Sequence, residues 1–177
     1  SILMEKHGLT TYSVYDKEQS KKTVDVSENI ITKPSQLSGM DIIVICIKNY
    51  SLESVARTIK QSISANEKDP LILSIANGRR NQEILPHYFK KIVYGIATYN
   101  AWIDETYLFG YENKQPLIIG TSDNSLQEEM NMIRAIFTPG LRVLISDNLA
   151  DAVHSKIVVN LTNSLTTLIG LGYSKDH

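Results

Sequence analysis

The sequence predicts an α/β fold, built around a parallel sheet and followed by one long helix. Apolar, β-branched runs at residues 41–47, 71–75 and 92–97 are typical of buried strands. Segments with helical periodicity separate these runs, and such alternation favours parallel strands. A last periodic segment, from about residue 148 to residue 170, is expected to form a helix that is long for a small α/β domain.

The first half of the chain supplies the strand and helix signals in order. Residues 9–16 and 20–26 alternate apolar and polar side chains around a polar turn, which predicts a hairpin after a helix cap at Gly8. The run "DIIVICI" is expected to be a central strand covered on both faces. A helix follows over "SLESVARTIKQSI", then the strand "PLILSI", a helix around "NQEILPHYFKK" that Pro86 kinks or starts, and the strand "IVYGIA".

From Tyr107 onward the pattern changes. The runs "YLFGY" and "PLIIG" flank a short polar segment, which suggests an antiparallel pair. A helix over "SLQEEMNMIRAIF" is expected to begin with a capping box between Ser125 and Glu128. After the short strand "RVLI", Asp147 is expected to cap the last helix.

Composition narrows the class of protein. The 177 residues are 42% hydrophobic and 21% charged, and the net charge of −1 contains no block of like charges. Nucleic acid and anionic membrane are therefore not expected partners. No run is long enough to span a bilayer and no secretory signal opens the chain, so we expect a cytoplasmic protein. Both ends of the chain look cut from something larger.

Cysteine and histidine give no sign of a metal centre. Cys46 is the only cysteine, which excludes an internal disulfide, and its apolar surroundings predict that it packs as a small hydrophobe. The four histidines have no ligand spacing with one another or with carboxylates, so we expect no metal site.

Candidate ligand-binding residues lie where the predicted parallel strands end, because ligands of open α/β sheets gather at that edge. Lys48 follows the first of these strands, Asn77 and Gly78 follow the second, and Ala101 lies in the segment after the third. Polar residues and an Asn-Gly turn are also common at strand ends without any function.

The last helix carries an unusual polar stripe. Lys156, Asn160, Asn163 and Thr167 share one face, while Ile157 and Leu161 lie on the opposite side. Asn and Thr are poor helix formers, so such a face makes sense if it lines a cleft and binds something. The alternative is that protein partners satisfy these amides in a packed interface.

The motifs "DIIVICIKNYS", "LILSIANGRRNQEIL", "VYGIATYNA" and "SKIVVNLTNSLTTLIG" together resemble the ketopantoate reductase family. The likeness covers most of the chain from about Gly8. It implies an incomplete Rossmann-like NADP(H)-binding domain over residues 1–146 and the start of a helical substrate domain over residues 147–177. The G-x-G-x-x-G turn of that family is absent from this sequence.

The resemblance also implies residue roles. Lys48, Asn77 and Ala101 match positions that contact the cofactor. Lys156 matches the general acid, and Asn160 matches a substrate-binding amide one turn later. Several members carry a second Asn four residues beyond the first. That position is Ser164 here, and the nearest Asn is Asn163, one residue earlier; this departure bears on which substrate is bound.

The expected activity is NADPH-dependent reduction of a 2-oxo acid, with 2-dehydropantoate as the leading substrate. A lysine ammonium beside the carbonyl oxygen would stabilise the charge that develops there and supply the proton, and a carboxylate in the same stripe would neutralise it. A reductase of another small oxo or hydroxy acid and a non-catalytic nucleotide-binding protein remain alternatives. A homodimer is compatible with the resemblance, and the chain by itself is expected to be inactive.

Overall fold

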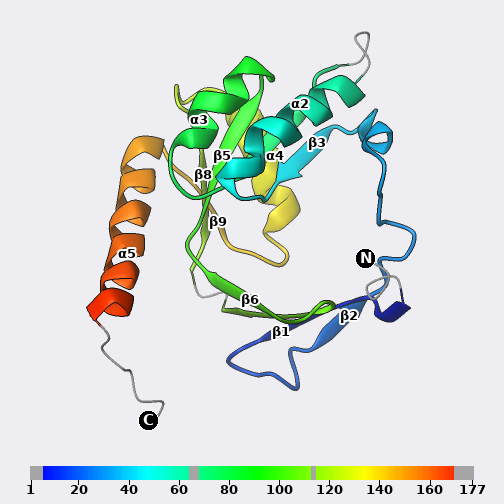
Figure 1. The fold of residues 1–177 in the computed structure, drawn as a ribbon, viewed down its shortest axis with the longest axis vertical. Coiled ribbons are helices and arrows are strands. Elements are labelled where there is room, and N and C mark those ends of the chain that lie inside the picture. Colours follow the sequence, from blue (N-terminus) through cyan, green and yellow to red (C-terminus); the bar gives the residue numbers. More distant parts are fainter. Residues whose placement is uncertain (1–5, 64–67, 113–114, 170–177) are drawn as a thin grey trace.

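A computed structural model describes residues 6–63, 68–112 and 115–169 of the chain, with only the backbone described for residues 163–169. Its strands form two sheets (Figure 1). The larger has five strands in the order β3-β4-β5-β8-β9, and the smaller has four in the order β2-β1-β7-β6. The chain enters through the smaller sheet, builds the first three strands of the larger one, returns to the smaller sheet and then completes the larger one.

The larger sheet confirms the predicted parallel core. Strands β3 (Ile42–Ile45), β4 (Leu71–Ile75) and β5 (Ile92–Ala97) are parallel neighbours. Strand β8 (Leu117–Gly120) pairs antiparallel with β5, and β9 (Val143–Ile145) pairs parallel with β8. The carboxyl ends of β3, β4 and β5 therefore meet at one edge of the sheet, the edge at which the candidate ligand-binding residues were expected.

Helices cover both faces of this sheet. Successive residues along a strand pack into two separate hydrophobic cores, one on each face. Helices α2 (Leu52–Ser62) and α5 (Leu149–Ile169) contribute to the core that contains Ile72. Helix α4 (Gln127–Phe137) contributes to the other, which contains Leu71 and Leu73. Alternate side chains of β4 point to opposite faces, so one strand supplies both cores.

The helix predicted around Pro86 is shorter than expected, because it ends before the proline instead of being kinked or started by it. Helix α3 (Arg80–Ile84) is followed directly by the 3-10 turn η3 (Leu85–His87), which contains Pro86. Two further 3-10 turns, η1 (Pro34–Leu37) and η2 (Asn49–Ser51), precede α2. The second of these directly follows Lys48, so the backbone turns sharply at the edge where β3 ends.

The smaller sheet was only partly predicted. The hairpin of β1 (Leu9–Ser13) and β2 (Lys22–Val24) is confirmed, and Gly8 before it has the left-handed φ of 71° that a helix cap requires. The predicted pairing of "YLFGY" with "PLIIG" is wrong. Strand β7 (Leu108–Glu112) pairs with β1 and with β6 (Asn100–Glu105), while β8 belongs to the larger sheet.

Burial explains why β8 pairs within the larger sheet and not with β7. Leu117 and Ile119 are fully buried between β5 and β9 in the core under α4. In the smaller sheet, β7 instead pairs with β6, and Trp102 of β6 lies against Gly110 of β7. A Cβ on Gly110 would fall 2.2 Å from the Trp102 ring, so the close approach requires glycine.

The first strand of the larger sheet departs from expectation as well. Strand β3 forms the edge of the five described strands, and Val44 is 43% exposed, so the strand is not covered on both faces. An all-apolar run does not by itself distinguish a central strand from an edge strand, because an edge strand also buries one face in a core.

Two predicted helix caps are also wrong. Ser125 makes no capping bond. Leu126, with a φ of 59°, stands at the cap position of α4 instead, because residues up to Ser125 turn back so that the Thr121 hydroxyl donates to the Ser125 carbonyl. At the start of α5 the cap is Asn148, one residue after Asp147. Its side-chain oxygen accepts a hydrogen bond from the backbone N–H of Asp151 at 3.1 Å.

The apolar side of the first turns of α5 is buried against the core. Leu149 and Val153 are buried in the core, and Ile157 packs against it. Beyond that point Leu161 is 58% exposed. The helix extends beyond the sheet along its side (Figure 1).

Candidate functional site

A cavity of about 760 Å³ lies at the carboxyl edge of the larger sheet. Its walls come from residues 46–51 after β3, residues 75–77 at the end of β4, and Ala97 at the end of β5. We call it the strand-end pocket. Its volume is in the range typical of small-molecule sites, which occur at this edge of open α/β sheets.

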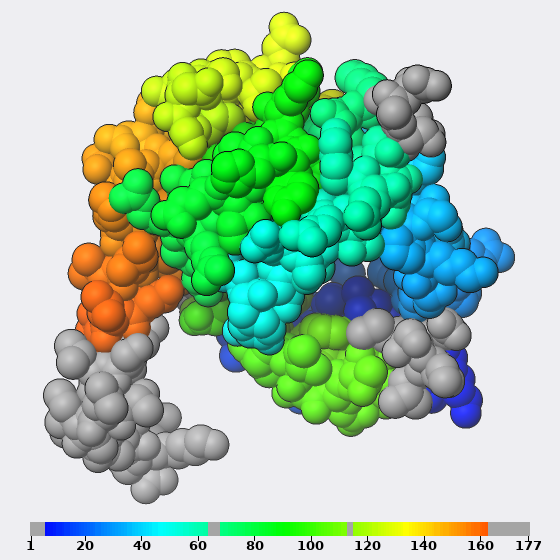
Figure 2. Space-filling view, turned by 45° about the horizontal axis from the view of Figure 1, so that its top comes forward, coloured from blue at the N-terminus to red at the C-terminus, as the bar shows by residue number. Residues whose placement is uncertain are grey.

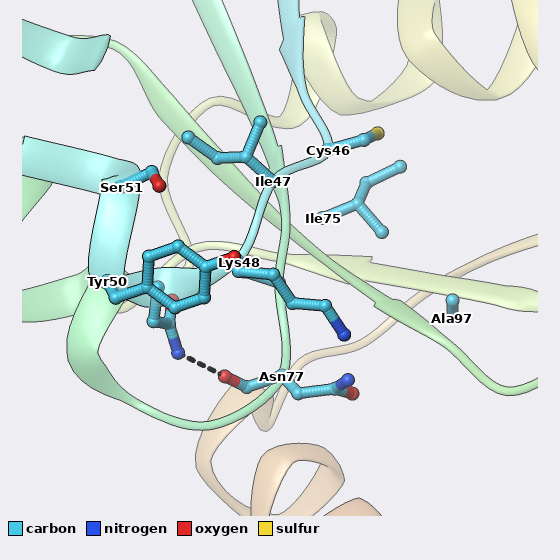
Figure 3. A pocket seen from close by; sticks show the side chains of 10 residues that line it. Cys46, Ile47, Lys48, Tyr50, Ser51, Ile75, Asn77 and Ala97 are labelled. Atoms are coloured by element: carbon cyan, nitrogen blue, oxygen red, sulfur yellow. Dashed lines mark hydrogen bonds between the residues drawn. The ribbon is translucent and has the colours of Figure 1, made fainter. Parts of the chain in front are cut away.

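Two of the predicted cofactor residues meet in this pocket. Lys48 and Asn77 both line it, and their side chains extend on the same side, toward Ala97 (Figure 3). Lys48 is the only charged side chain among the described lining residues. An ammonium beside neutral amides and apolar walls favours a ligand that carries negative charge or hydrogen-bonding groups.

The third predicted cofactor residue lies elsewhere. Strand β5 ends at Ala97, and Ala101 is the second residue of β6, paired with Tyr111. It does not line the strand-end pocket. The space-filling view shows the surface of residues near 105 directly below that of residues near 50, with a hollow beside the two (Figure 2).

Cys46 differs from its prediction. It lies one residue beyond the end of β3, is exposed and lines the pocket, so it does not pack as a small hydrophobe. Alternation along β3 explains this, since Val44 on the same face is also exposed. Partial desolvation by the pocket walls raises the pKa of the Cys46 thiol above its ordinary value.

Asn49 is a pocket residue that the sequence reasoning missed. Its side-chain Nδ2 donates to the backbone carbonyl of Asn77 at 2.6 Å and so ties together the segments that follow β3 and β4. The opposite atom of the amide, Oδ1, is buried and has no hydrogen-bond partner within the described residues. The only available signal in the sequence was an amide beside Lys48, which is too common to predict such a contact.

The predicted catalytic stripe is described only in part. Lys156 and Asn160 are half-buried on α5, whose preceding turns pack against β5. Neither lines the strand-end pocket. Asn163 and Ser164 lie on the same helix, but their side chains are outside the described residues.

Other kinds of site find no support in the part of the chain that is described. No cluster of three His, Cys, Asp or Glu side chains there is placed to hold a metal ion. No helix there is long and apolar enough to cross a membrane.

Comparison with known proteins establishes the family. The family model for ketopantoate reductase PanE/ApbA matches residues 3–124, more than half of the chain. The chain belongs to this family. Its fold is accordingly that of the Rossmann-like part of ketopantoate reductases, and the family is one of oxidoreductases.

Curated relatives carry the corresponding name. A 2-dehydropantoate 2-reductase of Archaeoglobus fulgidus is 26% identical over 136 residues, which are 76% of this chain and 45% of the relative. One from Halobacterium salinarum is 24% identical over 144 residues, 79% of this chain and 46% of the relative. The chain thus spans about half the length of the curated relatives it matches.

Solved structures confirm the fold. The 2-dehydropantoate 2-reductase of Geobacter metallireducens superposes with a TM-score of 0.79 at 22% identity, over 94% of this chain and 54% of that one. D-Mandelate dehydrogenase in a ternary structure with NADH and anilino(oxo)acetate gives 0.77 at 19% identity, over 98% and 56%. At these identities the likeness shows a shared fold and leaves the substrate open.

Proposed function

We propose that the full-length protein reduces a small 2-oxo acid with NADPH, and that this acid is 2-dehydropantoate, the product being pantoate for pantothenate and coenzyme A synthesis. Membership of the ketopantoate reductase family supports the reaction class. The observation that carries the proposal is the strand-end pocket, in which Lys48 and Asn77 meet at the edge where an α/β sheet binds nucleotides. The protein is proposed to act in the cytoplasm, and a dimeric relative from Staphylococcus aureus makes a homodimer a reasonable assembly.

The residues of the pocket fit the nicotinamide half of the cofactor. Asn49 is half-buried and its Oδ1 has no partner among the described residues, Lys48 offers a cation, and Ile75 and Ala97 provide apolar wall. The pyrophosphate needs a glycine turn at a helix N-terminus, and this sequence does not contain that fingerprint. We therefore propose that residues 1–146 form most of the nucleotide-binding domain, and that residues 147–177 begin the helical domain.

Lys156 is proposed as the general acid. When bound, the nicotinamide cofactor supplies the hydride. The Lys156 ammonium stabilises negative charge on the carbonyl oxygen and then gives that oxygen its proton. Asn160, one turn further on α5, donates a hydrogen bond that orients the substrate, with Asn163 and Ser164 as further substrate contacts.

Steady-state kinetics of two variants of the full-length protein test these roles. Lys156→Ala should lower kcat by about 10²–10⁴-fold, the usual contribution of a general acid, without weakening NADPH binding. Asn160→Ala should act mainly on the KM of the acid, because an orienting hydrogen bond exists in the ground state and in the transition state. A Lys156→Ala enzyme with unchanged kcat and a lowered melting temperature would show that Lys156 is structural.

A second substrate class has specific support. The D-mandelate dehydrogenase structure, which contains an aryl 2-oxo acid analogue, covers nearly the whole chain, and Ser164 departs from the family's more usual Asn. Comparing kcat/KM for 2-dehydropantoate and for a phenyl-substituted 2-oxo acid separates the two substrates. Turnover of neither acid, combined with no NADPH binding, would favour a non-catalytic member of the family.

A further inference from the structure

The two segments that carry Lys48 and Asn77 are joined through one side chain. Asn49 follows Lys48 directly, and its Nδ2 reaches the Asn77 carbonyl, 28 residues away in the sequence, at 2.6 Å. A carbonyl can only accept, so the amide nitrogen of Asn49 must face it and the side-chain orientation is fixed.

That orientation leaves the other half of the amide unsatisfied. Asn49 Oδ1 is buried and has no partner among the described residues. A buried carbonyl without a donor costs folding free energy, so the bond to Asn77 brings at most a partial gain in stability.

The bond also determines where Asn77 points. Gly78 follows with a φ of 83°, a left-handed conformation that turns the chain sharply after Asn77. Asn49 holds the Asn77 carbonyl on one side of this turn. The Asn77 side chain extends away from that carbonyl, on the same side of the pocket as the Lys48 side chain (Figure 3).

We infer that Asn49 is a positioning residue, which holds Lys48 and Asn77 in the arrangement that receives the nicotinamide end of the cofactor. This inference rests on the proposed function. Asn49 acts through the loop geometry and makes no contact with the reacting atoms. Its effect should therefore appear in cofactor affinity and not in the stability of the fold.

The test compares Asn49→Leu with wild type in the full-length protein. Leucine has nearly the shape of asparagine but removes both the donor and the unsatisfied oxygen. NADPH affinity measured by calorimetry should fall about 3- to 10-fold, the value of one net hydrogen bond, while the melting temperature is no lower than that of wild type. Bound NADPH should protect the Cys46 thiol from alkylation. The Asn49→Leu protein should need a correspondingly higher NADPH concentration for the same protection.

Asn81→Leu is the matched control. Asn81, like Asn49, has a buried Oδ1 without a partner among the described residues, but Asn81 is itself buried, bonds to Ser74 inside the fold and does not line the pocket. Its substitution should change the melting temperature and leave NADPH affinity unchanged. Asn49→Asp keeps the shape and replaces the donor by an acceptor facing a carbonyl, so it should lose at least as much affinity as Asn49→Leu.

Three results would overturn the inference. One is Asn49→Leu binding NADPH as tightly as wild type. Another is that Asn49→Leu lowers both the NADPH affinity and the melting temperature, and that Asn81→Leu lowers the NADPH affinity equally. Asn49 would then be merely structural. The third is that the wild-type protein does not bind NADPH. This result would contradict the proposed function itself, and it differs from the other two because it is seen in the unsubstituted protein.

Discussion

Replacing Gly110 by alanine should destabilise the smaller sheet, because the Trp102 ring occupies the place of the added Cβ. That carbon would lie 2.2 Å from Cε2 and 2.4 Å from Cζ2 and Nε1 of the indole. Carbon atoms in contact normally stay about 3.5–4.0 Å apart, so the ring or β7 must move by more than 1 Å, as a rough figure.

The movement would break contacts that the ring now makes. Trp102 Nε1 donates to the Tyr12 hydroxyl at 3.0 Å, and the two rings meet edge to face with centroids 6.1 Å apart. Tyr12 in turn donates to Asp104. Overpacking typically costs about 1–3 kcal/mol and a lost hydrogen bond about 1 kcal/mol, so we expect Gly110→Ala to cost about 2–4 kcal/mol.

Urea unfolding followed by tryptophan fluorescence measures this cost directly, because Trp102 is the only tryptophan in the sequence. Gly140→Ala is the matched control, since an added Cβ there meets no heavy atom within 4 Å and should be nearly neutral. In a Trp102→Ala background, followed by circular dichroism, Gly110→Ala should cost less than about 1 kcal/mol, because the clashing ring is gone. An equal cost with and without the indole would refute the reasoning.

Two further predictions concern the pocket and the helix caps. Cys46 should react with iodoacetamide more slowly at pH 7 than a free cysteine, because its pKa is raised and the thiolate is the nucleophile. Its rate should rise with pH, and bound NADPH should slow it; a rate independent of NADPH would place the cofactor elsewhere. Asn148→Ala should lower stability by about 1 kcal/mol in thermal unfolding, whereas Ser125→Ala should be nearly neutral because Ser125 makes no capping bond. Equal losses for the two substitutions would contradict the cap assignment.

Hydrophobic patterning predicted the parallel core well, because its strands are buried and their composition follows from burial. The runs at residues 41–47, 71–75 and 92–97 all became neighbouring parallel strands. The strand β6 could not be predicted in this way. Its sequence "NAWIDE" is mostly exposed and carries few good strand formers, and it is extended because it pairs with β7 across Gly110.

The residues of the site likewise divide into those that the sequence predicted and those that it did not. The rule that ligands gather at strand ends predicted Lys48 and Asn77 correctly as neighbours, because strand direction alone determines which ends meet. Asn49 and Cys46 depend on what surrounds them: one bonds a carbonyl 28 residues away, and the other is exposed because β3 is an edge strand. Patterns within a short window do not contain that information.

The packing of α5 explains why Lys156 and Asn160 should respond differently to substitution. Val153 is buried and Ile157 packs on the core, so the turn that carries Lys156 is held by the larger sheet. One turn later, Val159 and Leu161 are more than half exposed on either side of Asn160. In the role that we propose for it, Lys156 must be held in a fixed place relative to the reacting carbonyl, and the sheet supports the turn that carries it. The turn of Asn160 has less support from the sheet, so its geometry should depend more on what binds there, consistent with a role expressed in KM.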